Sequence, residues 1–239
     1  TAAELIPADG MLLLAAHIGR SHTLTQWLDP SIVDEGDPDL RDAELNLYDP
    51  QNPRQPPYDA AFVEQYRAAQ RARSQRISAW VLDRLKAFKA AGEPLREQGF
   101  VVHGTMADPK WLDPTIDPNG RRPRWCFLGD PQVVNMSPIG LARFCTLRSW
   151  LSQWSDEHSN ADGVRCAPKV TVPALMIGNG ADDACTPDDT EALFNALGSQ
   201  DKARVTIADA NHYYFGQPKL LAQSIQHCMA WLLDKGFAY

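Results

Sequence analysis

The chain has 239 residues, 44% of them hydrophobic, which is enough for one large α/β domain or for a domain with a cap. Its net charge of −7 argues against nucleic acid and anionic membranes as partners, because both attract clustered positive charge. Its five cysteines are scattered without a C-x-x-C pair, which argues against a disulfide framework and against a zinc site. We therefore expect a cytoplasmic protein that acts on a small molecule and uses no cofactor and no metal.

The first predicted element is a buried strand. Met11 to Ala16 form a short continuous apolar run, typical of a strand covered on both faces of a parallel sheet. Only two comparable runs follow, at 170–177 and 203–208. Three strands make a poor doubly wound sheet, so we expect further strands of the same sheet to lie outside this chain.

The middle of the chain predicts a largely helical cap inserted into the core. A helical pattern runs from about residue 59 to 91, and a second helix is predicted from about 138 to 154, each with apolar residues roughly on one side. The predicted division is therefore an α/β core at 1–28, a mostly helical cap insertion at 29–165 and core again at 166–239.

The last third alternates strands and helices. Thr186 is a predicted N-cap, Pro187 the first residue of a helix, and Gly198 its end. A final helix begins near Pro218, and Gly236 follows its end. This order is typical of the tail of a parallel α/β sheet. The residues that the final helix is predicted to bury are Leu221, Ile225, Cys228, Met229 and Leu232.

A loop that follows the strand at 170–177 contains the candidate acid, Asp183. Loops at the carboxyl ends of parallel strands are where α/β folds collect functional groups. A carboxylate there can hold an imidazole in one tautomer and stabilise the imidazolium that forms in catalysis. Asp183 could instead cap the next helix or occupy a polar turn. Asp182 is the adjacent alternative acid, because sequence does not settle one residue of register.

The loop after the strand at 203–208 contains the candidate base, His212. The order acid then histidine, at two successive strand ends, favours a functional pair over an isolated structural histidine. His17, at the end of the first strand, is a candidate substrate contact. Tyr213 and Tyr214, next to the histidine, are candidates for the same role.

With these residues, positions 5 to 235 resemble the C-terminal part of an α/β-hydrolase-fold serine hydrolase of the esterase and lipase type. The resemblance implies a doubly wound, mainly parallel sheet with a helical cap, Asp183 at the acid position and His212 at the histidine position. The chain contains no Gly-x-Ser-x-Gly. The resemblance therefore implies that an N-terminal fragment or second chain supplies the nucleophilic serine and the oxyanion hole.

The expected function is hydrolysis of an ester-like bond in a small hydrophobic substrate by Ser–His–Asp chemistry. One alternative is a different nucleophile, as in a dehalogenase or epoxide hydrolase, and another is a non-catalytic hydrolase-like binding protein. Within the chain, Ser21 is a minor alternative nucleophile, because it follows the first strand with the small residues Gly19 and Thr23 two positions to either side. His103-Gly104 resembles the beginning of an oxyanion loop, but its place after the long helix favours a cap residue.

Overall fold

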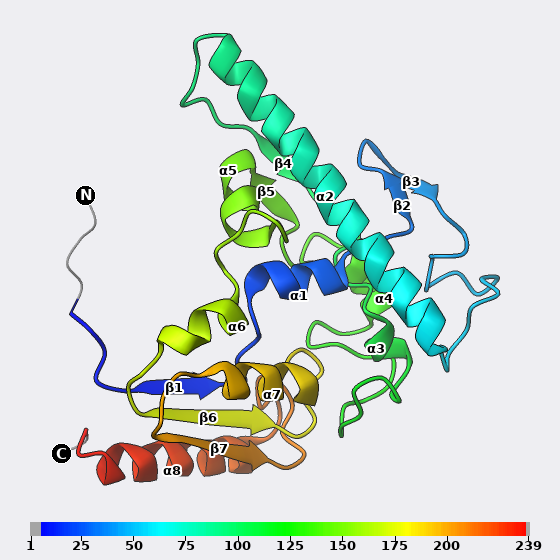
Figure 1. Ribbon diagram of the computed structural model, residues 1–239. Coiled ribbons are helices and arrows are strands. Elements are labelled where there is room, and N and C mark those ends of the chain that lie inside the picture. The colour runs from blue at the N-terminus through cyan, green and yellow to red at the C-terminus, as the bar shows by residue number, and fades with distance from the viewer. Residues whose placement is uncertain (1–5, 238–239) are drawn as a thin grey trace. The chain divides into compact units, whose positions relative to one another are not determined.

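A computed structural model describes residues 6–237, which form two compact units (Figure 1). Unit 1 comprises residues 6–18, Asp117–Arg121 and residues 163–237. Unit 2 comprises Gly19–Ile116 and Arg122–Asp162.

The units change at 18/19 and 162/163, whereas the expected boundaries were 28/29 and 165/166. Residues 117–121, which were expected in the cap, belong to unit 1. Two hydrogen bonds hold that short segment in unit 1. The amide of Gly120 donates to the Gly180 carbonyl at 2.9 Å, and the side chain of Asn119 donates to the Asp182 carbonyl at 2.7 Å. Such contacts join positions far apart in sequence, so composition does not reveal them.

Unit 1 contains a three-stranded sheet in the order β1-β6-β7, seen side by side in Figure 1. Its strands are β1 (Met11–Leu14), β6 (Ala174–Asn179) and β7 (Lys202–Ile207). Both pairings are parallel, which confirms the predicted strands and the mixed α/β class. Within the described residues, β1 and β7 are the two edges of this sheet.

The central strand β6 is buried on both faces, because its alternate side chains pack against different helices. Ala174 and Met176 belong to one apolar cluster with Leu193 of α7 (Pro187–Ala196). Leu175 and Ile177 belong to another with Trp231 of α8 (Pro218–Asp234). Two short helices, α6 (Gly163–Cys166) and η2 (Ala167–Lys169), precede β6.

Helix α7 begins as predicted, with Thr186 as N-cap and Pro187 in its first turn. The Thr186 side chain makes no capping hydrogen bond. The Asp117 carboxylate accepts instead from the Asp188 amide at 3.2 Å. A carboxylate at a helix N-terminus is favourable because unpaired amides and the helix dipole both attract negative charge there.

Helix α8 also begins where predicted, and Cys228 and Leu232 pack against the core as predicted, but the other three residues of the predicted buried stripe do not. Leu221, Ile225 and Met229 are 43%, 52% and 47% exposed. The residues that face the sheet include Ser224 and Trp231, with Leu220, Cys228 and Leu232 partly buried. The helix is apolar over a wider arc than the sheet of unit 1 covers, so periodicity alone did not identify the covered side.

Unit 2 is mainly helical and contains two small antiparallel sheets. Its longest element, α2 (Ala60–Ala90), confirms the predicted long helix, with the Asp59 side chain accepting from the Phe62 amide at 2.7 Å. Among residues 6–237, no helix combines the length and apolarity needed to cross a membrane. The remaining elements are α1 (Arg20–Trp27), β2 (Ile32–Asp34), β3 (Asp37–Arg41), β4 (Gly99–Val101), α3 (Pro109–Leu112), α4 (Pro131–Met136), β5 (Phe144–Thr146), α5 (Leu147–Ser149) and the π-helix η1 (Trp150–Trp154).

The continuous helix predicted at 138–154 was wrong. Pro138 and Gly140 disfavour a helix, and Ala142 has a positive φ of 55°. Residues 144–146 instead form β5, which pairs antiparallel with β4. Only the last part is helical, because pairing with a strand far upstream outweighs the local helical pattern.

The main apolar core of unit 2 lies between α1, α2 and the β5–η1 region. Leu24, Val81, Leu147 and Trp150 have no exposed surface there. The indole N–H of Trp150 donates to Ser78 Oγ at 3.0 Å, so its polar atom is satisfied inside the core.

Candidate active site

The loop after β6 places one carboxylate, Asp182, in a fully buried position. Its Oδ1 accepts hydrogen bonds from the amides of Ala184 and Cys185, both at 2.8 Å. Its own amide donates to the Asn179 carbonyl at 3.2 Å, which closes a tight turn. The carboxylate is therefore held in one orientation by backbone groups.

His212, in the loop after β7, meets this carboxylate. Its Nδ1 lies 3.0 Å from Asp182 Oδ2 and 3.1 Å from Oδ1, and its side chain is 16% exposed. The two loops converge because they follow neighbouring parallel strands, whose carboxyl ends lie at the same edge of the sheet. A buried carboxylate at this distance can fix the imidazole tautomer and stabilise its protonated form.

The preferred acid of the sequence analysis, Asp183, is not the residue that lies against His212. Asp183 is buried in the same turn, 6% exposed, while the adjacent Asp182 takes the position beside the imidazole. The hydrogen bonds from the Ala184 and Cys185 amides hold the Asp182 carboxylate in the position beside the imidazole. One residue of register in a loop depends on its turn geometry, which sequence patterns do not resolve.

Asn179, the last residue of β6, supports the histidine loop and was missed in the sequence analysis. Its side-chain nitrogen donates to the carbonyls of Asn211 at 2.9 Å and His212 at 3.4 Å. Its side-chain oxygen accepts from the Tyr214 hydroxyl at 2.6 Å. The sequence offered one signal for this role: Asn179 places a polar side chain between two glycines at the end of an otherwise apolar strand.

The three candidate substrate contacts lie in different environments. Tyr213 is 65% exposed, and its ring centroid lies 4.4 Å from that of His212 in an edge arrangement. Tyr214 turns its hydroxyl to Asn179 and packs against the core of unit 1, so its contacts are those of a supporting residue. His17 is exposed, three residues after the end of β1.

Cys185 is a further side chain at this edge of the sheet that the sequence analysis did not single out. It is 3% exposed, and its thiol donates to the Ala15 carbonyl at 3.0 Å, just past β1. Loops after all three strands of the sheet therefore meet around Asp182 and His212. Asp182, Cys185 and His212 each offer a donor atom that lies within 4.8 Å of the other two, so this trio has the chemistry and spacing of a metal site.

Ser21, the minor alternative nucleophile, lies in the first turn of α1 in unit 2. It is 4% exposed, and its hydroxyl donates to the Ala161 carbonyl at 3.5 Å. A nucleophile elbow exposes its serine on a strained turn between strand and helix. Ser21 is buried and has no positive φ, so its environment does not favour the alternative.

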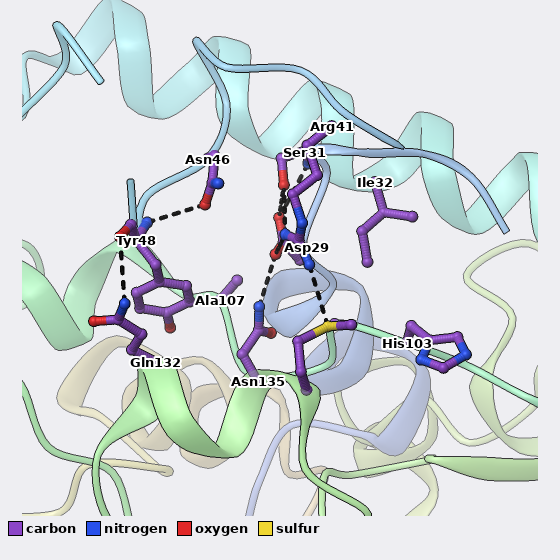
Figure 2. Close-up of polar contacts among 12 residues, drawn as sticks. Asp29, Ser31, Ile32, Arg41, Asn46, Tyr48, His103, Ala107, Gln132 and Asn135 are labelled. Atoms are coloured by element: carbon purple, nitrogen blue, oxygen red, sulfur yellow. Dashed lines mark hydrogen bonds and ion pairs between the residues drawn. The ribbon is translucent and has the colours of Figure 1, made fainter. Parts of the chain in front are cut away.

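Unit 2 contains a buried polar cluster around Asp29, which Figure 2 shows between the β2–β3 hairpin and α4. The Asp29 carboxylate accepts from Ser31 Oγ at 2.6 Å, from Arg41 at 2.7 Å and from the Asn135 side chain at 2.7 Å. The Asn135 oxygen in turn accepts from the Met106 amide at 3.0 Å. Since Arg41 comes from β3 and Asn135 from α4, the cluster ties these segments of unit 2 to the loop that contains Asp29, as satisfied buried networks do.

His103, labelled in Figure 2, belongs to the same part of unit 2. Burial lowers its pKa, and the nearby guanidinium groups of Arg143 and Arg73 lower that pKa further. Its carbonyl accepts from Arg73 at 2.8 Å. His103 is thus favoured in its neutral form, in a region organised by arginine side chains.

Unit 2 also has a cleft of about 580 Å³. Trp80 and Phe100 form an aromatic wall, with ring centroids 5.1 Å apart. Glu35, Arg76 and His103 supply polar groups to the same cleft. Apolar clefts with a few polar groups are typical of small-molecule sites.

No protein-family model and no curated protein matches the chain. Among solved structures it is similar to the non-heme bromoperoxidase candidate BpoC of Mycobacterium tuberculosis H37Rv, with 21% identity and a TM-score of 0.27 over 36% of this chain and 30% of that one. It is also similar to a monoacylglycerol lipase of Paleococcus ferrophilus, with 18% identity and a TM-score of 0.34 over 63% of this chain and 51% of that one. The chain thus spans about half of the lipase and less of the other protein. These similarities carry no argument for an activity. The candidate acid–base chemistry depends on the geometry of Asp182 and His212.

Proposed function

We propose that this chain carries the acid and the histidine of a hydrolase that cleaves an ester-like bond. The observation that carries the proposal is the buried Asp182 carboxylate, 3.0 Å from His212 Nδ1 at the carboxyl ends of two parallel strands. Asp182 replaces Asp183 as the proposed acid, because the geometry favours it.

In this proposal, His212 accepts the proton of a serine hydroxyl and later gives it to the leaving group. Asp182 orients the imidazole and stabilises its positive charge. Asn179 and Tyr214 are positioning residues, since they hold the histidine loop without meeting the reacting atoms. Tyr213 and His17 remain proposed substrate contacts.

The serine and the oxyanion donors are proposed to come from an N-terminal segment or a second chain. Two surfaces of unit 1 support this. Within the described residues, β1 pairs with a strand on one side only, and a bare edge of a parallel sheet accepts another strand. In addition, α8 exposes an apolar stripe, the kind of surface that marks an interface.

The proposed substrate is small and hydrophobic. The exposed Tyr213 ring, whose centroid lies 4.4 Å from that of His212, supports an apolar acyl or alcohol group. A dehalogenase-type or epoxide-hydrolase-type reaction would use the same Asp182–His212 pair with a carboxylate nucleophile. The nucleophile of the partner polypeptide separates these reactions.

The first test is whether a polypeptide bearing Gly-x-Ser-x-Gly co-purifies with this chain, and the second is ester hydrolysis by the two together. His212→Ala and Asp182→Asn should each lower kcat on a chromogenic ester by about 10⁴-fold, the loss typical of a disrupted triad. Asp183→Asn should retain activity within about tenfold, and His227→Ala, on α8, serves as the control histidine.

Full activity in both the His212 and the Asp182 variants would refute the proposal. Loss of activity in Asp183→Asn, with activity kept in Asp182→Asn, would return the acid role to Asp183.

A further inference from the structure

We propose that Asp182, Cys185 and His212 form a binding site for Zn²⁺. A carboxylate oxygen, a sulfur and an imidazole nitrogen lie within 4.8 Å of one another. These are the three donor types that zinc takes from proteins, and three such ligands leave the fourth tetrahedral position to a water molecule. Spacing along the sequence gives no sign of this site. Asp182 and Cys185 lie in the loop after β6, whereas His212 lies in the loop after β7, so no short motif contains all three ligands.

The donor set selects the metal. Calcium and magnesium take oxygen ligands, whereas sulfur and imidazole nitrogen favour softer ions. Zinc has no redox chemistry and no geometric preference of its own, so it tolerates a trio assembled by loops.

The surroundings of the trio suit a metal site. The amides of Ala184 and Cys185 hold the Asp182 carboxylate from behind, as outer-shell groups hold ligands in metal proteins. The His212 side chain is 16% exposed, so an ion can reach the trio from solvent. Asp182 and Cys185 are themselves buried, so the bound ion would be largely desolvated.

Binding requires one proton to leave. The Cys185 thiol, which donates to the Ala15 carbonyl at 3.0 Å, gives up that proton to solvent and binds zinc as the thiolate. His212 binds through a neutral ring nitrogen. The S–H bond of Cys185 breaks as the zinc–sulfur bond forms, the proton passes to solvent, and no redox partner is involved.

Zinc at this position would occupy the same carboxylate and imidazole that the proposed hydrolysis needs. Inhibition by zinc therefore rests on the proposed function, whereas zinc binding does not. A direct binding measurement without any ester keeps the two proposals separate.

The experiment titrates the whole reduced chain with Zn²⁺ in a calorimeter and with Co²⁺ in a spectrophotometer. We expect one Zn²⁺ per chain and a thiolate-to-cobalt charge-transfer band in the near ultraviolet. Cys185→Ser and His212→Gln should each weaken zinc binding by more than about 100-fold, because removing a direct ligand exceeds the effect of an outer-shell change. Cys166→Ser, which removes an exposed thiol, should leave the affinity unchanged.

Circular dichroism and thermal melting of each variant exclude unfolding as the cause of lost binding. His212→Gln is informative even if Cys185→Ser fails to fold, since His212 is partly exposed. The proposal is overturned if the wild-type chain binds no Zn²⁺, if bound Co²⁺ shows no thiolate band, or if His212→Gln binds as tightly as wild type. Displacement of Zn²⁺ by an equal concentration of Ca²⁺ would also overturn it.

Discussion

At the scale of single residues, the position of His212 depends on side chains of β6 and the loop that follows it. Asp182 contacts the imidazole, and Asn179 binds the backbone of the histidine loop and the Tyr214 hydroxyl. Asn179 is 6% exposed, so water does not replace its hydrogen bonds when the side chain is removed. The rigidity of the candidate active site is therefore a property of buried polar contacts.

Asn179→Ala should lower the free energy of unfolding by about 1–3 kcal/mol, because it leaves the Tyr214 hydroxyl and two carbonyls without this partner. Urea denaturation measures the change. Asn195→Ala, at an exposed position of α7, is the matched control and should shift stability by less than about 0.5 kcal/mol. Equal stability of the two variants would show that Asn179 does not hold the loop.

At the scale of elements, α2 organises unit 2 through a buried arginine as well as through its apolar side. Arg73 has no exposed surface, and its guanidinium donates to both carboxylate oxygens of Glu35 at 2.9 and 2.7 Å. It also donates to the carbonyls of Asp29, His103 and Gly104 at 2.8 to 3.1 Å. A planar guanidinium suits such a set, because its donors reach several acceptors at once.

Arg73→Met should destabilise the protein by about 3 kcal/mol, because it leaves Glu35 and buried carbonyls without their donor. Thermal or urea unfolding checks this value. Arg71→Met changes an exposed arginine of the same helix and should stay within about 0.5 kcal/mol of wild type. A loss below about 1 kcal/mol in Arg73→Met would mean that solvent satisfies these groups.

The elements also show how far local patterns are predictive. Helix α2 was predicted within a residue or two, because its periodicity is a local signal. The helix predicted at 138–154 failed because β5 pairs with β4, more than forty residues upstream. Strand pairing depends on a partner that a window of sequence does not contain.

At the scale of the whole molecule, unit 1 exposes apolar surface on α8. Leu221, Ile225, Met229 and Leu233 follow one another at four-residue intervals and are 43% to 59% exposed. Residues at this spacing lie along one side of a helix. A stripe of this kind favours association, and the proposed partner is the polypeptide that bears the nucleophile.

Leu221→Gln combined with Ile225→Gln should weaken association with the polypeptide bearing the nucleophile by about ten- to a hundredfold. The reason is that the complex would bury two leucine-sized apolar side chains, and both variants replace them with polar ones. Sedimentation velocity of the mixture measures the dissociation constant. The matched control, Val133→Gln with Ile139→Gln, changes exposed apolar residues of unit 2. Equal dissociation constants for the two double variants would exclude α8 as the interface, while unchanged circular dichroism shows that folding is intact.

The amino-acid sequence by itself determined the strands of unit 1, their parallel class, the starts of α7 and α8, and the two loops in which the candidate acid and histidine lie. These features follow from runs, caps and periodicities that act over a few neighbouring residues. Only the tertiary structure decided that Asp182 meets His212, which side of α8 is covered, that residues 117–121 join unit 1, and that Cys185 lies in the site. Each of these depends on contacts between segments distant in sequence, and folding alone brings such segments together.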